Sequence, residues 1–285
     1  MEIHLSQFAG FCDGVKRAYE MVMTTDMSRI KSPVFVLGSL VHNNEVNKKI
    51  EERGIKKIER DFFFSAKPGE IGTVIITAHG VGPDVYKIAK KKGIDIIDTT
   101  CPKVIKVQRL AKVFSERGNK IILVGDKDHK EVRGINEWGG GKAVVISREK
   151  DLEKLDFEKE EKIAVLSQTT QNEDLYKKIA VEISRKFPSA EIIHTTCGTT
   201  HLRQEEIKKM AVDNDLVLII GSLASANSGR LYGIAEKINK NSHFIEKAND
   251  IKKEWLMKAK KVGISAGAST PPWVIEKVLK RVSGI

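Results

Sequence analysis

The chain has 285 residues, of which 41% are hydrophobic and 31% charged, a composition typical of a soluble globular protein with one to three domains. Its net charge is +11, but the lysines are dispersed along helix-like segments, aromatic residues make up only 6%, and no nucleic-acid-binding motif is present. This charge pattern argues against a nucleic-acid partner and favours solvated surfaces that attract an acidic protein or an anionic substrate.

The expected location follows from the apolar segments. Residues 1–12 lack the basic start and apolar stretch of a signal peptide. No apolar run approaches the roughly 18 residues of a membrane span. We therefore expect a cytoplasmic protein without a membrane partner. An odd number of cysteines, three, in a reducing compartment argues against a disulfide framework.

In chain order, three nearly evenly spaced cysteines, Cys12, Cys101 and Cys197, each precede the same series of predicted elements. A helix-like segment with apolar residues three or four apart comes first. A short apolar strand ending in glycine follows, then a polar loop, another helical segment and a second strand. The helical segments are 14–23, 102–114 and 201–212; the glycines are Gly38, Gly125 and Gly221; the second strands lie within 73–80, 163–170 and 262–270.

This repeated order predicts the fold class. Short apolar segments that alternate with helical ones are typical of α/β units with parallel sheets. We predict three pseudo-threefold-related α/β modules with small parallel sheets, at residues 1–96, 97–193 and 194–285. Because ligands bind beyond the carboxyl ends of parallel strands, the loops should converge on one cavity, with one cysteine from each module.

Three converging cysteines suit a metal centre. Each is predicted between a strand end and a helix start, where the helix N-terminus favours the thiolate that binds metal. Structural zinc usually takes four ligands from close cysteine pairs, and no such pair exists here. A four-iron cluster normally takes four cysteines, so three would leave one iron open for catalysis. Zinc and three unrelated cysteines remain alternatives.

Polar side chains follow the strands of all three modules. These candidates are His42, His79, His129, Glu131, Thr169, Ser225, Asn227 and Ser269. As a set they suit the binding of phosphate oxygens. Glu131 is the one carboxylate among them, and a lone carboxylate in a partly dry pocket suits proton delivery. A Walker A loop and a GxGxxG motif are absent, so nucleotide binding is not indicated.

The motifs together resemble a known family. They are "GFCDGVKRA", "VHNNEV", "AHGV", "DTTCPKVIKV", "HKEVRG", "SQTT", the segment from Cys197 to Gln204, "ASANSGRL" and "AGASTPP". They occur in family order from Gly10 to Pro272 and resemble the 4-hydroxy-3-methylbut-2-enyl diphosphate reductases of the methylerythritol phosphate route to isoprenoids.

The resemblance implies a trefoil of three α/β modules around one central, oxygen-sensitive 4Fe–4S cluster per chain, with Cys12, Cys101 and Cys197 as its ligands. It implies an oxidoreductase that removes the hydroxyl of an allylic diphosphate with two electrons and two protons. The products would be isopentenyl and dimethylallyl diphosphates. The electron donor would be a ferredoxin or a flavodoxin, and such donors are acidic, which suits the positive charge of this chain.

The resemblance also assigns roles to residues. Glu131 matches the proton donor, and Thr169 matches the residue that orders the hydroxyl, the acid and nearby water. The diphosphate site would comprise His42, His79, His129, Thr169, Ser225, Ala226, Asn227 and Ser269.

Some positions depart from the family pattern. Lys130 replaces the usual proline before the acid. Ala226 offers only its backbone N–H, and Leu223 and Ala224 replace a more polar pair. Two other enzymes remain alternatives: a non-redox iron–sulfur hydratase acting on a phosphorylated small molecule, which would turn over without a reductant, and a zinc hydrolase.

Overall fold

The computed structural model describes residues 1–158 and 161–284 and divides the chain into two compact units. The first unit comprises Met1–Lys16, Val41–Lys49 and Gly198–Ile285. The second comprises Arg17–Leu40 and Ile50–Cys197. Within the described residues, we find no helix that combines the length and the apolar character needed to cross a membrane.

The strands form three four-stranded sheets, and every pairing between them is parallel. One sheet, with the order β1-β12-β10-β11, lies in the first unit; the sheets β3-β2-β4-β5 and β7-β6-β8-β9 lie in the second. The strands are β1 Glu2–Leu5, β2 Val34–Leu37, β3 Lys56–Ile58, β4 Thr73–Ile76, β5 Asp95–Asp98, β6 Lys120–Val124, β7 Val144–Ile146, β8 Ile163–Ser167, β9 Glu191–Ile192, β10 Leu216–Ile220, β11 Ser242–Ile245 and β12 Lys261–Ala266.

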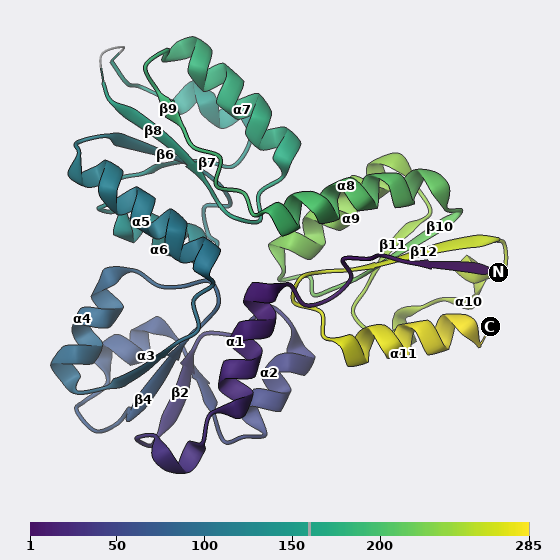
Figure 1. Cartoon of the computed structure of the whole chain (residues 1–285), viewed down its shortest axis with the longest axis horizontal. Helices are drawn as coiled ribbons and strands as arrows, with labels where there is room; N and C mark the ends of the chain where they lie inside the picture. The colour runs from purple at the N-terminus through teal and green to yellow at the C-terminus, as the bar shows by residue number, and fades with distance from the viewer. Residues whose placement is uncertain (159–160, 285) are drawn as a thin grey trace. The chain divides into compact units, whose positions relative to one another are not determined.

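Helices flank these sheets (Figure 1). They are α1 Asp13–Thr24, α2 Asn44–Glu51, α3 Arg60–Ser65, α4 Pro83–Lys92, α5 Pro102–Glu116, α6 Lys130–Trp138, α7 Glu173–Lys186, α8 Gly198–Asp213, α9 Ala226–Ile238, α10 Lys253–Leu256 and α11 Pro272–Ser283. Short 3₁₀ helices span Met27–Arg29, Glu149–Lys154 and Ala248–Asp250.

The predicted α/β class and the repeated order of elements are confirmed. The helices α1, α5 and α8 directly follow the three cysteines, and β2, β6 and β10 end immediately before the predicted glycines. The second strands of the repeat are β4, β8 and β12. In each sheet the two repeat strands are central, since they are buried along most of their length and pair on both sides.

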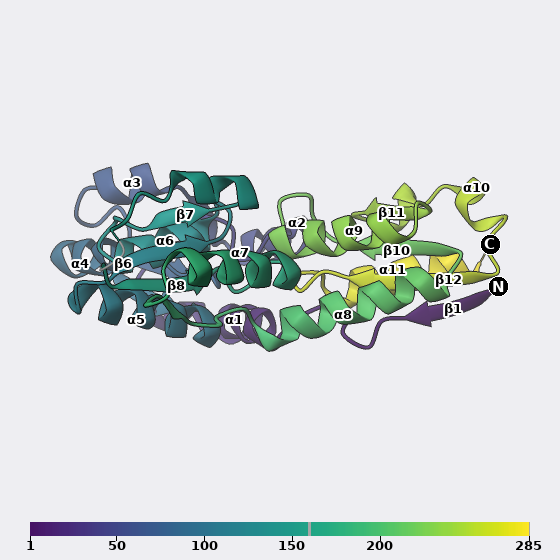
Figure 2. The same ribbon diagram turned by 90° about the horizontal axis from the view of Figure 1, so that it is seen from above.

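The first strand departs from the predicted module boundaries. β1 pairs with β12, with Ile3 opposite Val262 and His4 opposite Gly263. It therefore belongs to the sheet β1-β12-β10-β11, whose other strands come from the predicted third module, and not to the first module. Figures 1 and 2 show this purple strand beside yellow β12 in both views. The expected boundary at residue 96 also falls inside β5, Asp95–Asp98. Edge strands of four residues carry too little hydrophobic periodicity to reveal their partner.

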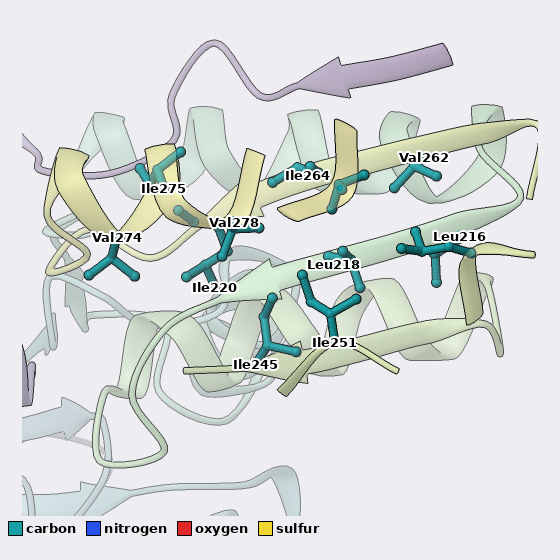
Figure 3. Packing of buried hydrophobic residues seen from close by; sticks show 13 residues of the cluster. Leu216, Leu218, Ile220, Ile245, Ile251, Val262, Ile264, Val274, Ile275 and Val278 are labelled. Carbon is teal, nitrogen blue, oxygen red and sulfur yellow. The ribbon is translucent and has the colours of Figure 1, made fainter. Parts of the chain in front are cut away.

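The first unit has one core cluster between its sheet and α11 and another between the sheet and the helices α8 and α9. Leu218, Ile220 and Ile264 of the central strands pack with Val274 and Val278 of the helix, all of them buried (Figure 3). β10 is apolar along its whole length because helices cover both faces of this parallel sheet. The central strands are thereby fixed, and so are the loops at their carboxyl ends.

In the second unit, the sheet β7-β6-β8-β9 has different helices on its two faces. Val107, Ala111 and Phe114 of α5 pack with residues of α6, β6 and β8. Ile179 and Ile183 of α7 pack with the alternate residues of the same strands. Because successive strand residues point to opposite faces, α5 and α7 lie on opposite sides of this sheet.

Candidate active site

Each cysteine is held by an equivalent backbone hydrogen bond beyond the second strand of a repeat. The accepting carbonyl belongs to the second residue after the end of β4, β8 or β12. The bonds run from the N–H of Cys12 to Ala268 (3.2 Å), of Cys101 to Ala78 (3.0 Å) and of Cys197 to Thr169 (2.8 Å). Among the described residues none of the three cysteines forms a disulfide, and each is partly exposed and lies immediately before one of the helices α1, α5 and α8. The predicted position between strand and helix is confirmed for each.

Two of the cysteines follow a Thr-Thr pair that is bonded in the same way. The hydroxyl of Thr99 donates to the carbonyl of Ile76 (2.5 Å), and that of Thr195 donates to the carbonyl of Ser167 (2.9 Å). Both threonines therefore join the segment before their cysteine to the end of a central strand. Buried threonines with satisfied hydroxyls hold such a segment in one position.

A buried carboxylate braces the segment before Cys197. Glu173 accepts hydrogen bonds from Thr196 Oγ1 (2.8 Å) and from His194 Nε2 (2.8 Å). Burial tends to raise the pKa of Glu173, but these hydrogen bonds and nearby positive charge outweigh it and hold the pKa below its usual value. The role of Glu173 could not be predicted from the sequence, because a glutamate in the first turn of a helix is usually solvated.

A buried arginine braces the segment before Cys12. Arg203, on α8, donates one hydrogen bond to the carbonyl of Ala266 at the end of β12 (2.9 Å) and another to the carbonyl of Gly10 (2.7 Å). The same guanidinium thus joins the end of a central strand to the cysteine loop. The only sequence signal for it was its place in the segment from Cys197 to Gln204.

Glu131 and Thr169, predicted to act together, are in direct contact. Glu131 lies in the first turn of α6 and is buried. Its Oε1 accepts the backbone N–H of Thr169 (2.6 Å), and its Oε2 lies 3.0 Å from the Thr169 hydroxyl. Since the Thr169 carbonyl accepts from the N–H of Cys197, this one residue connects the acid to a cysteine.

Two of the predicted histidines also meet in the second unit. The rings of His79 and His129 pack edge to face, with centroids 5.4 Å apart. His129 caps α6, because its Nδ1 accepts the N–H of Glu131 (3.2 Å). His79 Nδ1 lies 3.5 Å from the Thr77 hydroxyl. The bond from Glu131 fixes the His129 tautomer, so that His129 Nε2 is left to carry the proton.

The first unit holds the remaining predicted polar residues at the start of α9. Ser225 caps the helix by accepting the N–H of Ser228 (3.3 Å), and Ala226 and Asn227 form the first turn. Among the described residues, the side-chain nitrogen of Asn227 is buried and donates to no protein group. A helix N-terminus with a buried unused donor suits an anion.

Ser269 and His42 are neighbours in the same unit. The buried Ser269 donates its hydroxyl hydrogen to the backbone carbonyl of His42 (3.1 Å). Its oxygen can still accept, whereas its hydrogen is used to position the loop before α2. Ser269 and His42, both predicted for the diphosphate site, are thus connected through the backbone of His42.

Lys130, which departs from the family pattern, lies over Gly38. A shallow depression with room for little more than one water molecule is lined by Gly38, Glu59, Arg60, Lys130 and Arg133 with Leu37, Thr77, Gly80 and Val81. Gly38 has a φ of +87°, and a Cβ there would stand 2.5 Å from Lys130 Nζ. Burial lowers the pKa of Lys130 from its ordinary value, and the charge of Glu59 opposes this only partly.

The predicted site residues therefore fall into two groups, one in each unit. The first unit contains Cys12, His42, Ser225, Ala226, Asn227 and Ser269. The second contains His79, Cys101, His129, Glu131, Thr169 and Cys197.

The chain is similar to known proteins over almost its whole length. Residues 3–283 match the family described as LytB protein. Curated relatives named 4-hydroxy-3-methylbut-2-enyl diphosphate reductase include one from Aquifex aeolicus, 37% identical over 100% of this chain and 97% of the relative. Another, from Citrifermentans bemidjiense, is 38% identical over 100% of this chain and 98% of the relative.

Solved structures of the same kind are similar over almost the whole chain. The E-1-hydroxy-2-methyl-but-2-enyl-4-diphosphate reductase of Plasmodium falciparum has a TM-score of 0.90 and 30% identity, covering 98% of this chain and 87% of that one. A second structure, of (E)-4-hydroxy-3-methyl-but-2-enyl diphosphate reductase, has a TM-score of 0.71 and 36% identity, covering 100% of both chains. Because the family match and these similarities extend over almost the whole chain, the chain belongs to the LytB family.

Proposed function

We propose that this protein reduces 4-hydroxy-3-methylbut-2-enyl diphosphate to isopentenyl diphosphate and dimethylallyl diphosphate. Its relatives carry the name of this reductase, and one solved relative is described as the terminal enzyme of the non-mevalonate pathway. Within the chain, the observation that supports the proposal most is the equivalent backbone anchoring of the three cysteines. Three unrelated buried cysteines would not share one hydrogen-bonding pattern.

The cysteines fit an iron–sulfur cofactor. None of them forms a disulfide, and each lies immediately before the first turn of a helix. Four-iron clusters normally take four cysteines, so Cys12, Cys101 and Cys197 would hold one 4Fe–4S cluster per chain with one iron left open. When bound, such a group would relay electrons one at a time from the donor to the substrate and would offer a Lewis-acidic iron.

Glu131 and Thr169 would handle the protons. Removing the hydroxyl as water consumes two protons: one leaves with the water and the other is added to carbon. With Thr169 fixed by its backbone bond, a proton on Glu131 Oε2 can be shared with the Thr169 hydroxyl 3.0 Å away, which in turn can pass a proton to the substrate oxygen.

The diphosphate would bind to hydrogen-bond donors among the predicted site residues. The N-terminus of α9 offers the Ser225 cap, the Ala226 N–H and the Asn227 amide. His42, His79, His129 and Ser269 complete the proposed set. Electrons would come from a ferredoxin or a flavodoxin, whose acidic surface suits the net charge of +11.

The first test is the iron and acid-labile sulfide content of protein purified without oxygen, followed by a reductase assay with reduced methyl viologen. About four iron and four sulfide per chain are expected. Turnover of the allylic diphosphate should require the reductant. Turnover without any reductant would support a hydratase instead, and low iron after anaerobic reconstitution would refute the cluster.

Glu131→Gln should lower kcat at least ~100-fold, because the amide keeps the shape of the side chain but cannot deliver a proton. Cluster content should be unchanged. The matched control is Glu137→Gln on the same helix, where the carboxylate pairs with Arg60 at 3.0 Å and is not assigned to the reaction. Near-normal kcat in Glu131→Gln would exclude the proton-donor role.

A further inference from the structure

The helix α5 carries an exposed groove that the reaction itself does not use. The groove is lined by Pro102, Ile105, Lys106, Arg109, Leu110 and Val113, which all belong to this one helix. Their three- and four-residue spacing places them on a single face. Val113 remains 39% exposed, although valine is normally a core residue.

The groove lies on the face of α5 that points away from the sheet, because the opposite face of the helix packs in the core. Val107, Ala111 and Phe114 are buried against β6 and β8. A helix that already covers its sheet with one stripe normally presents a polar stripe to solvent. Here Pro102, Ile105, Leu110 and Val113 make the solvent stripe partly apolar, which is typical of a docking surface.

The charges around the groove have one sign. Its exposed cations are Lys103, Lys106, Arg109 and Lys112, and the only carboxylate on the helix is Glu116. Glu116 lies 3.8 Å from Lys112. Among the described residues, no ion pair involves Lys103, Lys106 or Arg109. An apolar strip flanked by unneutralised cations fits an acidic protein surface.

The helices that follow the other two cysteines lack this charge. In α1, Lys16 and Arg17 are balanced by Asp13 and Glu20. In α8, the three cations Arg203, Lys208 and Lys209 are balanced by Glu205, Glu206 and Asp213. Only α5 therefore combines a cysteine at its N-terminus with an excess of positive charge.

We propose that the exposed face of α5 is the docking site of the electron donor, a small acidic one-electron carrier protein. This inference rests on the proposed function, because it places the donor directly beside Cys101, a proposed ligand of the redox group. Each docking event oxidises one carrier by one electron, so two reduced carriers are consumed for each substrate reduced. The apolar strip would cover the rim of the carrier around its redox centre, and the cations would meet the surrounding carboxylates.

The test compares two electron sources in one anaerobic assay. The variant is Lys106→Glu combined with Arg109→Glu, and the sources are a reduced acidic [2Fe–2S] ferredoxin and reduced methyl viologen. The matched control is Lys178→Glu with Arg185→Glu on α7, which covers the opposite face of the same sheet. Both variants change the net charge equally, and both target exposed residues.

The α5 variant should raise the KM for ferredoxin at least ~10-fold, while its viologen-driven rate and iron content stay within about twofold of the parent. Its KM should also depend less steeply on ionic strength. The α7 control should change the ferredoxin KM by less than about twofold.

Contrary outcomes separate the two proposals. An unchanged ferredoxin KM, or an equal rise in both variants, overturns the docking site and leaves the reductase intact. A change of oligomeric state confined to the α5 variant, seen by size-exclusion chromatography, would assign the groove to a second copy of this chain instead. A parent protein with a loaded cluster that does not turn over with viologen overturns the proposed function and this inference with it.

Discussion

At the scale of single residues, the site depends on side chains whose hydrogen bonds leave them little freedom. Glu131 is bonded by both oxygens to Thr169, and the Thr169 carbonyl is bonded to the N–H of Cys197. The acid and the cysteine thus share one positioning residue. Sequence motifs identified all three, because such residues follow strands and stand at helix starts.

Lys130 should lower the free energy of unfolding by an amount that depends on pH. Burial lowers its pKa in the folded state from the ordinary value of 10.5, so the folded protein binds this proton less well than the unfolded chain. Stability is therefore reduced at neutral pH and recovers as pH rises toward 10.5. Lys130→Met, which keeps the packed stem, should raise the free energy of unfolding at pH 7, with a smaller gain at pH 10.

Urea unfolding at the two pH values measures this difference. Lys178→Met is the control, because the Lys178 side chain is 67% exposed and pairs only with exposed Glu149. A gain that is equal at both pH values, or one that grows with pH, would contradict the assignment.

At the scale of elements, the loops that carry the cysteines are held by the ends of the central strands. Arg203 of α8 makes this connection for Cys12 through the carbonyls of Ala266 and Gly10. Glu173 does similar work for the segment before Cys197 through Thr196 and His194. The two side chains that hold these segments carry opposite charges and lie on different kinds of helix in the repeat.

Removing the two hydrogen bonds of Arg203 should lower the stability of the protein and make the loop before Cys12 more mobile. Arg203→Met leaves two carbonyls without their charged donor, which should cost about 3 kcal/mol in the free energy of unfolding. Iron occupancy after reconstitution should fall as well. Lys209→Met, at an exposed position of the same helix, should change the unfolding midpoint little. Equal midpoints for the two variants would show that Arg203 is not a brace.

The elements themselves were predictable, and the braces were not. Helical spacing after each cysteine and a glycine after each central strand are local signals, so the order of elements could be predicted from sequence. Arg203 and Glu173 look like ordinary helix-surface residues, because their partners are backbone carbonyls and side chains far away in sequence. Burial of a charge by tertiary contacts leaves no local pattern.

At the scale of the whole molecule, the first strand determines which parts of the chain depend on one another. β1 pairs only with β12 and thereby completes the sheet of the first unit. The four residues of β1, Glu-Ile-His-Leu, do not indicate in the sequence that its partner strand lies far along the chain. The repeat does supply a signal in retrospect: β5 and β9, which precede Cys101 and Cys197, also lie at sheet edges.

A proline in β1 should therefore affect one sheet and spare the others. His4→Pro removes a backbone donor from a strand whose single neighbour is β12. Hydrogen exchange should become faster in residues 2–6 and 261–266, whereas β6 and β8 of the second unit keep their protection. His4→Thr, which keeps the donor, is the control. Faster exchange throughout the chain would mean that the two units unfold as one.

The pairing of β1 with β12 also sets an order of events for the newly made polypeptide. Glu2–Leu5 leaves the ribosome long before Lys261–Ala266, so the sheet β1-β12-β10-β11 cannot close until β12 has been made. The loop of Cys12 is bonded to Ala268 and Ala266 and must wait with it. Cys101 and Cys197, by contrast, take their positions from residues already made. Cofactor delivery that needs all three cysteines in place must therefore follow the synthesis of β12 and of Ala268.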